Sequence, residues 1–308
     1  MITELERIRA ARAALAHLTT LAPACAEALH ALTVYYGPAD ALDKLVSPKT
    51  SQELRDECAG AMTIKQLHTQ IRTVDNATQA SGARVLIPED KNWPQRLDDL
   101  TQVTYCAASA AAMCLWVRGT DEPITARTVA VCGSRAATPY GTTIAADLTR
   151  DLAAAGWTTA TTSGYGISAA AIRGALTTEA RVVVVLAGGI DIPHPHNLRG
   201  LLTQVTGNHG LLATAYPPGT TPTRARATTA TRLLAGMTSG TVLVEAAHAS
   251  TSLAAIEEAV LLGRHAMVMP GPVTSATSTG AHQALRDHRA ARLVTSGSDV
   301  LTELAHIR

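Results

Sequence analysis

The hydrophobic pattern of the first 80 residues has the period of amphipathic helices. Ile2, Leu5, Ile8 and Leu15 fall on one helical face, as expected for a helix that buries one apolar stripe. Proline and glycine interrupt this pattern and separate four further helical segments. We therefore predict a small helical domain over residues 1–80, with helices near residues 2–18, 23–34, 38–46, 51–59 and 63–79.

After Gly82 the pattern changes, and short apolar segments alternate with helical ones. The Pro/Thr/Arg-rich segment 216–231 is predicted as a surface loop. Strands are expected at 84–87, 114–118, 129–132, 158–162, 182–186, 211–214, 241–245, 265–269 and 292–295, and helices at 143–155, 167–177, 198–206, 252–262, 281–288 and 299–307. This alternation predicts an α/β domain over residues 81–308 with a parallel sheet, whose ligands bind at the carboxyl ends of the strands.

Two of the predicted strands end in glycine turns that lead into helices. One runs into Gly133-Ser134-Arg135, and the strand at 158–162 runs into Ser163-Gly164. A helix that begins after such a turn presents free backbone N–H groups and the positive end of its dipole. Arg135 adds a planar five-donor guanidinium suited to phosphate, and Ser134 adds a hydroxyl. The sequence therefore predicts an anion-binding site at these turns.

Positive charge is concentrated in the part of the chain that carries the glycine turns. Residues 1–126 contain 12 Lys or Arg against 15 Asp or Glu, whereas residues 127–308 contain 14 against 10. No acidic residue occurs in the 53 residues from 192 to 244. Such a surface tolerates a polyanion, although a loop of scattered, solvated arginines has the same composition. The basic residues of this segment are Arg199, Arg224, Arg226, Arg232, His194, His196 and His209.

Composition excludes several classes of protein. With 46% apolar and 17% charged residues, the 308-residue chain is able to bury a large core and is not of a disordered type. No apolar run approaches the roughly 20 residues that span a bilayer, and the acidic amino terminus is not that of a signal peptide. The cysteines Cys25, Cys58, Cys106, Cys114 and Cys132 form no Cys-x-x-Cys pair, which favours free thiols in a reducing compartment. We expect a soluble, cytoplasmic protein with no membrane contact.

Short motifs rich in small residues follow one another in a fixed order along nearly the whole chain. They are Asp90-Lys91-Asn92-Trp93-Pro94, Leu115-Trp116-Val117-Arg118-Gly119, Gly133-Ser134-Arg135, Ser163-Gly164, Arg173-Gly174, Gly188-Gly189-Ile190-Asp191, Pro217-Pro218-Gly219, Glu245-Ala246 and Pro270-Gly271-Pro272. In order and spacing these motifs resemble the DNA-processing protein A family, abbreviated DprA and also called Smf.

The resemblance implies an α/β protein with an extended Rossmann-like, mostly parallel sheet and helices on both faces, preceded by a small helical domain similar to a sterile-alpha or helix-hairpin-helix module. It implies a protein that binds and protects single-stranded DNA and loads a RecA-type recombinase, in DNA uptake (natural transformation) and recombination. A homodimer is also expected. Some members end in a winged-helix domain, and because this chain ends at Arg308, we expect none. The residues expected to bind phosphate are Gly133, Ser134, Arg135, Ser163, Gly164, Arg173, Asn197, Arg199, Arg232 and Gly271.

The chain departs from the family pattern at two motifs. The pattern Ser-Gly-x-Ala-x-Gly-Ile-Asp is shortened to Ser163-Gly-Tyr-Gly-Ile-Ser168 and loses its acid. The signature Phe-Pro-x-Arg-Asn-Arg becomes Ala227-Thr-Thr-Ala-Thr-Arg232, in which only the last arginine is in register. We therefore expect Arg232 to contribute more to DNA affinity than Arg224 or Arg226. These losses predict a divergent member that keeps the fold and has an altered ligand surface.

A second class of function uses the same anion site, namely a Rossmann-like enzyme or sensor acting on nucleoside phosphates. Glu245, at a predicted strand end, is the one acid placed for such chemistry, and capping a helix or pairing with an arginine is its structural alternative. The chain has no P-loop, no Gly-x-Gly-x-x-Gly and no Gly-x-Ser-x-Gly motif. His194 and His196 have no nearby carboxylate or cysteine to complete a metal site. We expect a non-catalytic strand binder without metal or cofactor.

Overall fold

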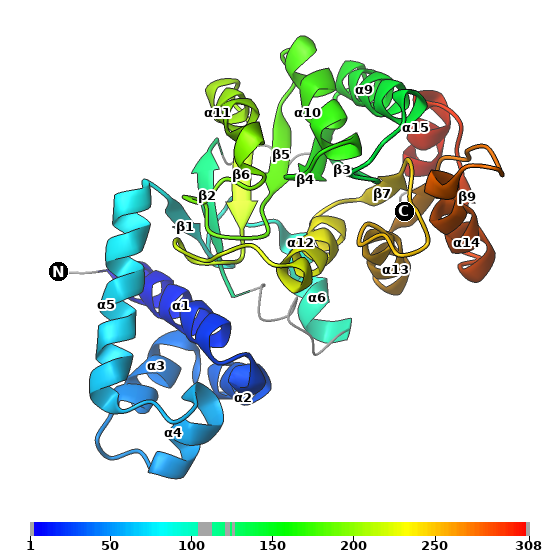
Figure 1. The fold of residues 1–308 in the computed structure, drawn as a ribbon. Coiled ribbons are helices and arrows are strands. Elements are labelled where there is room, and N and C mark those ends of the chain that lie inside the picture. The colour runs from blue at the N-terminus through cyan, green and yellow to red at the C-terminus, as the bar shows by residue number, and fades with distance from the viewer. Residues whose placement is uncertain (1–2, 104–112, 121–123, 125–126, 306–308) are drawn as a thin grey trace.

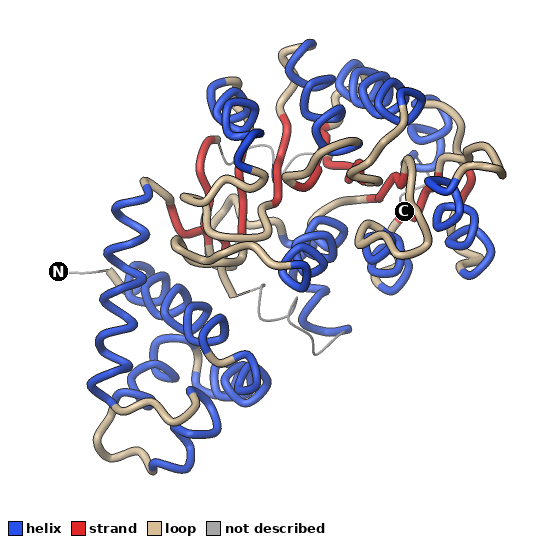
Figure 2. Tube along the Cα trace, viewed as in Figure 1, coloured by secondary structure: helices blue, strands red, loops and turns tan. Residues whose placement is uncertain are grey.

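The computed structural model describes residues 3–103, 113–120, 124 and 127–305, and these form two parts (Figure 1). Helices from the amino-terminal region form the smaller part. The larger part is a sheet with helices on both faces, which appears in Figure 2 as red strands between layers of blue helices. Ile2, Cys106 and residues 306–307 of the last predicted helix lie outside the described residues.

The five helical segments predicted near the amino terminus each form a helix. Capping boxes fix two of the starts, because the side chains of Thr3 and Glu6, and those of Thr63 and Gln66, satisfy each other's backbone N–H groups. Leucines from different helices form their shared core, with Leu15 fully buried. The helices are α1 Glu4–Leu21, α2 Ala26–Tyr36, α3 Pro38–Val46, α4 Gln52–Ala59 and α5 Ile64–Ser81.

Nine strands of the described residues form one mixed sheet. They are β1 Arg84–Leu86, β2 Leu115–Gly119, β3 Thr128–Cys132, β4 Thr158–Thr162, β5 Val182–Val185, β6 Leu211–Thr214, β7 Gly240–Leu243, β8 His265–Val268 and β9 Arg292–Leu293. Their order is β1-β2-β6-β5-β4-β3-β7-β8-β9. The pairs β1–β2 and β2–β6 are antiparallel, and the pairs from β6 to β9 are parallel. The chain therefore starts the parallel sheet at β3 and extends it first to one side and then to the other.

Helices cover both faces of this sheet because its strands are apolar on both sides. Val129 and Val131 of β3 contact one layer of helices, whereas Ala130 and Cys132 contact the other. The first layer contains α9 Pro139–Ala154, α10 Ile167–Thr177, α11 Arg199–Gly207 and α15 Gly297–Ala305. The second contains α6 Asp98–Val103, α12 Arg224–Gly236, α13 Leu253–Leu261 and α14 Thr279–Asp287 (Figure 1). The predicted α/β fold is confirmed.

Helix α12 replaces much of the surface loop predicted at residues 216–231, and that part of the prediction is wrong. Threonine has a low helix propensity, but Leu233 and Leu234 bury themselves against the sheet and stabilise the helix. The hydroxyls of Thr228 and Thr231 bond back to carbonyls one turn earlier, which satisfies them within the helix. Tertiary packing therefore outweighs the local preference of this segment.

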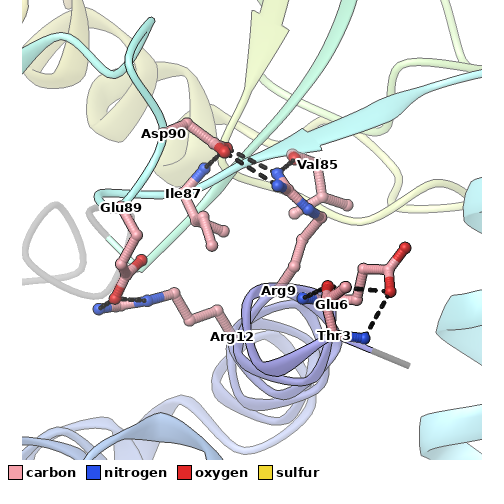
Figure 3. A network of polar contacts seen from close by, with 8 residues as sticks. All are labelled: Thr3, Glu6, Arg9, Arg12, Val85, Ile87, Glu89 and Asp90. Atoms are coloured by element: carbon pink, nitrogen blue, oxygen red, sulfur yellow. Dashed lines mark hydrogen bonds and ion pairs between the residues drawn. The ribbon is translucent and has the colours of Figure 1, made fainter. Parts of the chain in front are cut away.

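An ion-pair network joins α1 to the segment that follows β1 (Figure 3). Arg9 donates two hydrogen bonds to Asp90, of 2.6 and 2.9 Å, and a third of 2.7 Å to the carbonyl of Val85. Arg12 donates to Glu89 at 2.7 Å. Burial by itself raises the pKa of Asp90, but the hydrogen bonds from Arg9 and the Ile87 N–H outweigh it and hold that pKa below its ordinary value. The helical part is thus fastened to the edge of the sheet by a bidentate, charge-assisted contact.

Apolar packing continues across the same junction. Ile87 and Trp116, from the sheet edge, belong to one buried cluster with Leu15 and Leu67 of the helices. Helix α5 ends at Ser81, close to the expected domain boundary between residues 80 and 81, and β1 follows after two residues. Within the described residues, no helix has the length and apolar character needed to cross a membrane. Four of the cysteines, Cys25, Cys58, Cys114 and Cys132, are free thiols.

Candidate functional site

The strand order reverses its direction of growth between β3 and β7. From β3 the chain adds β4, β5 and β6 on one side, and it then returns to add β7, β8 and β9 on the other. The crevice at such a switch point, outside the carboxyl ends of the strands, is where open α/β sheets bind ligands. Gly133 follows β3 there, and Glu245 lies just beyond the end of β7.

Glu245 occupies the helix start that the sequence predicts as an anion seat. Its carboxylate, only 3% exposed, accepts hydrogen bonds from the backbone N–H of Thr138 at 3.0 Å and from the Thr138 hydroxyl at 2.6 Å. The Ser134 N–H is also taken, by the carbonyl of Glu245 at 2.6 Å. The N-terminus of α9 is therefore capped from within the protein and does not offer the free N–H groups that we expected.

The second glycine turn packs directly against the first. The Ile167 N–H donates to the carbonyl of Ser134 at 3.1 Å, and a Cβ on Gly164 would lie 4.0 Å from Cγ of Arg135. Helix α10 starts at Gly166, and no side chain caps its N-terminus. The structure thus brings Arg135 and the Ser163–Gly164 turn together, at the end of a helix whose dipole favours an anion.

A pocket of about 560 Å³ opens beside these two turns, and we call it the Arg135 pocket. Its walls come from the ends of β3, β4 and β5, from the segment 194–197 and from the first turns of α12. Arg135 and Arg224 are both exposed, and none of the described residues that line the pocket is acidic. Five of the predicted phosphate-binding residues line it: Gly133, Arg135, Ser163, Gly164 and Asn197.

Four other predicted residues lie elsewhere. Ser134 is buried behind the pocket, where its hydroxyl accepts from the Ala136 N–H at 3.1 Å. Arg173 is exposed on α10, and Arg199 lines a separate cavity of about 80 Å³ together with Asp191. Gly271 follows β8, and its N–H donates to Nε2 of His282 at 3.5 Å. The structure does not bring these four residues into the Arg135 pocket.

Arg232 also lies outside the pocket, because its side chain faces helix α13. Its Nε is 3.7 Å from a carboxylate oxygen of Glu258, and its guanidinium is 4.0 Å from Glu257. Burial raises the pKa of the Glu258 carboxyl despite the nearby Arg232. This arginine, the one in register with the family signature, therefore joins two helices in the structure.

Two residues of the pocket were not among the predicted contacts. Arg224 begins α12 and lines the pocket, with a hydrogen bond of 3.4 Å to the carbonyl of Ala249. Its signal in the sequence is the acid-free stretch, but only the helix places it at the pocket. Tyr165 stands between two glycines, which is a turn signal that carries no information on the direction of its ring.

The pocket has the chemistry of an anion site and lacks an activated nucleophile among its described residues. Cys132 lines it, but burial raises the pKa of this thiol to about 12, so the sulfur stays protonated at neutral pH. The described residues contain no group of three or more potential metal-ligating side chains. His194 and His196 are therefore pocket walls with donor and acceptor capacity.

Comparisons with known proteins agree with this architecture. The family model for DNA recombination-mediator protein A matches residues 84–305. A protein of Mycobacterium tuberculosis assigned as a DNA processing protein DprA is 36% identical over 302 residues, which cover 95% of this chain and 75% of that protein.

Two solved structures share the fold. The DNA processing protein A of Streptococcus pneumoniae superposes with a TM-score of 0.73 at 23% identity and covers 98% of both chains. The protein of the same name from Helicobacter pylori, described for its single-stranded DNA binding mode, has a TM-score of 0.61 at 18% identity over 73% of this chain and 97% of that one. Since the family model covers most of the chain, and the identity to the mycobacterial protein extends over nearly all of it, this chain belongs to the DNA recombination-mediator protein A family.

Proposed function

We propose that this protein binds single-stranded DNA at the Arg135 pocket and delivers the strand to a RecA-type recombinase. The observation that carries the proposal is the composition of the pocket, which combines two exposed arginines with no acidic residue among its described walls. Phosphate groups are recognised by such planar, multi-donor guanidinium groups. Support also comes from the family, which is named for recombination mediation, and from the relative whose title names single-stranded DNA.

The shape of the site favours a single strand over a duplex. The pocket is a concave space of about 560 Å³ at the strand ends, which matches a nucleotide unit. A single strand can turn one nucleotide into such a space, whereas a duplex keeps its bases paired and stacked. We therefore expect tighter binding to single strands and an affinity that falls steeply with salt.

Binding without catalysis is part of the proposal. The hydrolase alternative needs Glu245 as a base or as a ribose ligand, but both oxygens of that carboxylate accept hydrogen bonds from Thr138. The thiol of Cys132 is held in its protonated form by burial. These two observations favour a binding protein over an enzyme or sensor of nucleoside phosphates.

Delivery to a recombinase and dimer formation complete the proposal. Both rest on family membership, and each has its own measurement. Recombinase filaments should form faster on a single strand covered by a single-strand-binding protein when this protein is added. Light scattering should give twice the mass of one chain. A cytoplasmic location stays a prediction.

Fluorescence anisotropy with labelled oligothymidine and a duplex of equal length tests the binding proposal. Arg135→Ala should weaken single-strand binding by about 1.5 to 3 kcal/mol, the range for hydrogen bonds to charged groups, with little change in melting temperature. Arg173→Ala is the matched control, since Arg173 is exposed outside the pocket. Equal affinity for duplex, or affinity that does not change between about 50 and 200 mM salt, would contradict the proposal.

A further inference from the structure

Tyr165 is the single Phe, Tyr or Trp among the described residues that line the Arg135 pocket. It is 41% exposed, an unusual state for a large apolar ring that has folded neighbours available. Within the described part of the chain, its hydroxyl has no hydrogen-bond partner and its ring stacks on no other aromatic. The ring is therefore free to contact a ligand in the pocket.

The backbone on both sides of Tyr165 is held in place. Gly166 has a φ of +64°, and a Cβ there would clash with the carbonyls of Ser134 and Arg135, the latter at 2.7 Å. The Ile167 N–H is bonded to the same Ser134 carbonyl. On the other side, Gly164 is buried against the stem of Arg135. This double contact fixes Tyr165 relative to Arg135 before any ligand binds, which lowers the entropy cost of a contact.

The surroundings of the ring suit a planar, uncharged group. Val185, Ala187, Ala227 and Ala230 supply apolar wall, and histidines 194 and 196 supply polar groups at the same pocket. A nucleotide presents a flat base and a phosphate close together. Arg135 matches the phosphate, and the aromatic face of Tyr165 matches the base.

We propose that Tyr165 stacks on a nucleobase of the bound strand, so that the Arg135 pocket holds a base as well as backbone phosphate. This inference rests on the proposed function and adds to it the group that distinguishes a strand with bases from a bare sugar-phosphate chain. Stacking is tolerant of sequence, because every base has a π-face. The contact also explains a preference for single strands, since both faces of a base are covered within a duplex.

Two labelled probes of equal length separate base from backbone: a short oligothymidine and an oligomer of abasic sites. Wild-type protein should bind oligothymidine about tenfold more tightly, within the range for one base stacked on an aromatic side chain. Tyr165→Leu should lose that preference and keep both its abasic affinity and its salt dependence, because phosphate contacts are unchanged. Tyr165→Phe keeps the ring and should bind like wild type.

Tyr140→Leu is the matched control. Tyr140 is 44% exposed, lies at the start of α9 outside the pocket, and donates its hydroxyl to the carbonyl of Pro270 at 3.0 Å. Equal wild-type binding of the two probes, or an equal loss on both in Tyr165→Leu, overturns the inference and leaves the proposed function standing. Wild-type protein that binds neither probe overturns the proposed function as well. Unchanged melting temperatures for the variants ensure that the comparison concerns binding.

Discussion

The carboxylate of Glu245 holds the start of helix α9 through Thr138, with its two oxygens accepting the Thr138 N–H at 3.0 Å and the Thr138 hydroxyl at 2.6 Å. The same hydroxyl accepts from the Gly141 N–H at 3.1 Å and so caps the helix. The contact ties the end of β7 to α9 across the point where the strand order reverses. A buried negative charge at a helix N-terminus is stabilised by the helix dipole, which accounts for an acid beside an otherwise basic site.

Glu245 should therefore matter for stability. Glu245→Ala leaves the Thr138 donors without their acceptor and is expected to lower the free energy of unfolding by about 2 to 4 kcal/mol. Glu245→Gln keeps one acceptor and should lose about half as much. Urea unfolding measures both, with Glu257→Gln on the exposed side of α13 as the control. A nucleoside-phosphate hydrolysis that vanishes in Glu245→Gln, at unchanged stability, would speak for the enzyme alternative.

The Arg9–Asp90 contact should make stability depend on pH in the acid range. Because the pKa of Asp90 is lower in the folded state, its carboxylate stabilises the fold above the unfolded pKa of about 3.9. That contribution is lost as the pH falls through the lower, folded value. Asp90→Asn should cost about 1 to 2 kcal/mol at pH 7, and the difference from wild type should shrink steadily below about pH 4.

Chemical unfolding across a pH series checks this, with Asp287→Asn as a control. Asp287 is exposed on α14 and lies far in sequence from the junction. A difference between wild type and Asp90→Asn that stays constant down to about pH 2 would show that the charge of Asp90 is not what fastens the helical part.

Gly166 should resist substitution for two separate reasons. Its φ of +64° disfavours any side chain, and a Cβ would also press on the carbonyls of the Arg135 turn. Gly166→Ala is expected to cost about 2 to 4 kcal/mol and to weaken single-strand binding by displacing Tyr165. Gly156→Ala has a similar φ of +76° with nothing within 4 Å, so it should cost only about 1 kcal/mol. Equal losses in thermal or urea unfolding would show that the close approach adds nothing.

Arg224 and Arg232 should divide affinity and stability between them. Arg224→Ala removes a guanidinium from the pocket, and single-strand affinity should fall about tenfold while the melting temperature stays constant. Arg232→Ala leaves the buried Glu258 without its nearby cation, and unfolding should become easier by about 1 to 3 kcal/mol at nearly unchanged affinity. Anisotropy and unfolding on the same two variants decide this. A larger affinity loss in Arg232→Ala would restore the register expected from the family signature.

Most of the secondary structure was open to prediction because it depends on local pattern. The strands at 158–162 and 211–214 and the helix at 167–177 were predicted with their observed bounds, since an apolar run closed by glycine has few other solutions. Helix α12 was missed because its threonines favour other conformations locally, and its stability comes from Leu233 and Leu234 packed on the sheet.

The sequence by itself determined the α/β class, the helical amino-terminal part, the basic character of one half and the glycine turns after β3 and β4. These properties follow from periodicity, composition and short motifs, all of which act over a few residues. Only the tertiary structure decided which charges face the site. Glu245 meets Thr138 across 107 residues of chain, Arg232 turns to α13, and Tyr165 and Arg224 meet at one pocket. Such partners depend on how strands and helices pack in space, and the spacing of residues along the chain does not encode that packing.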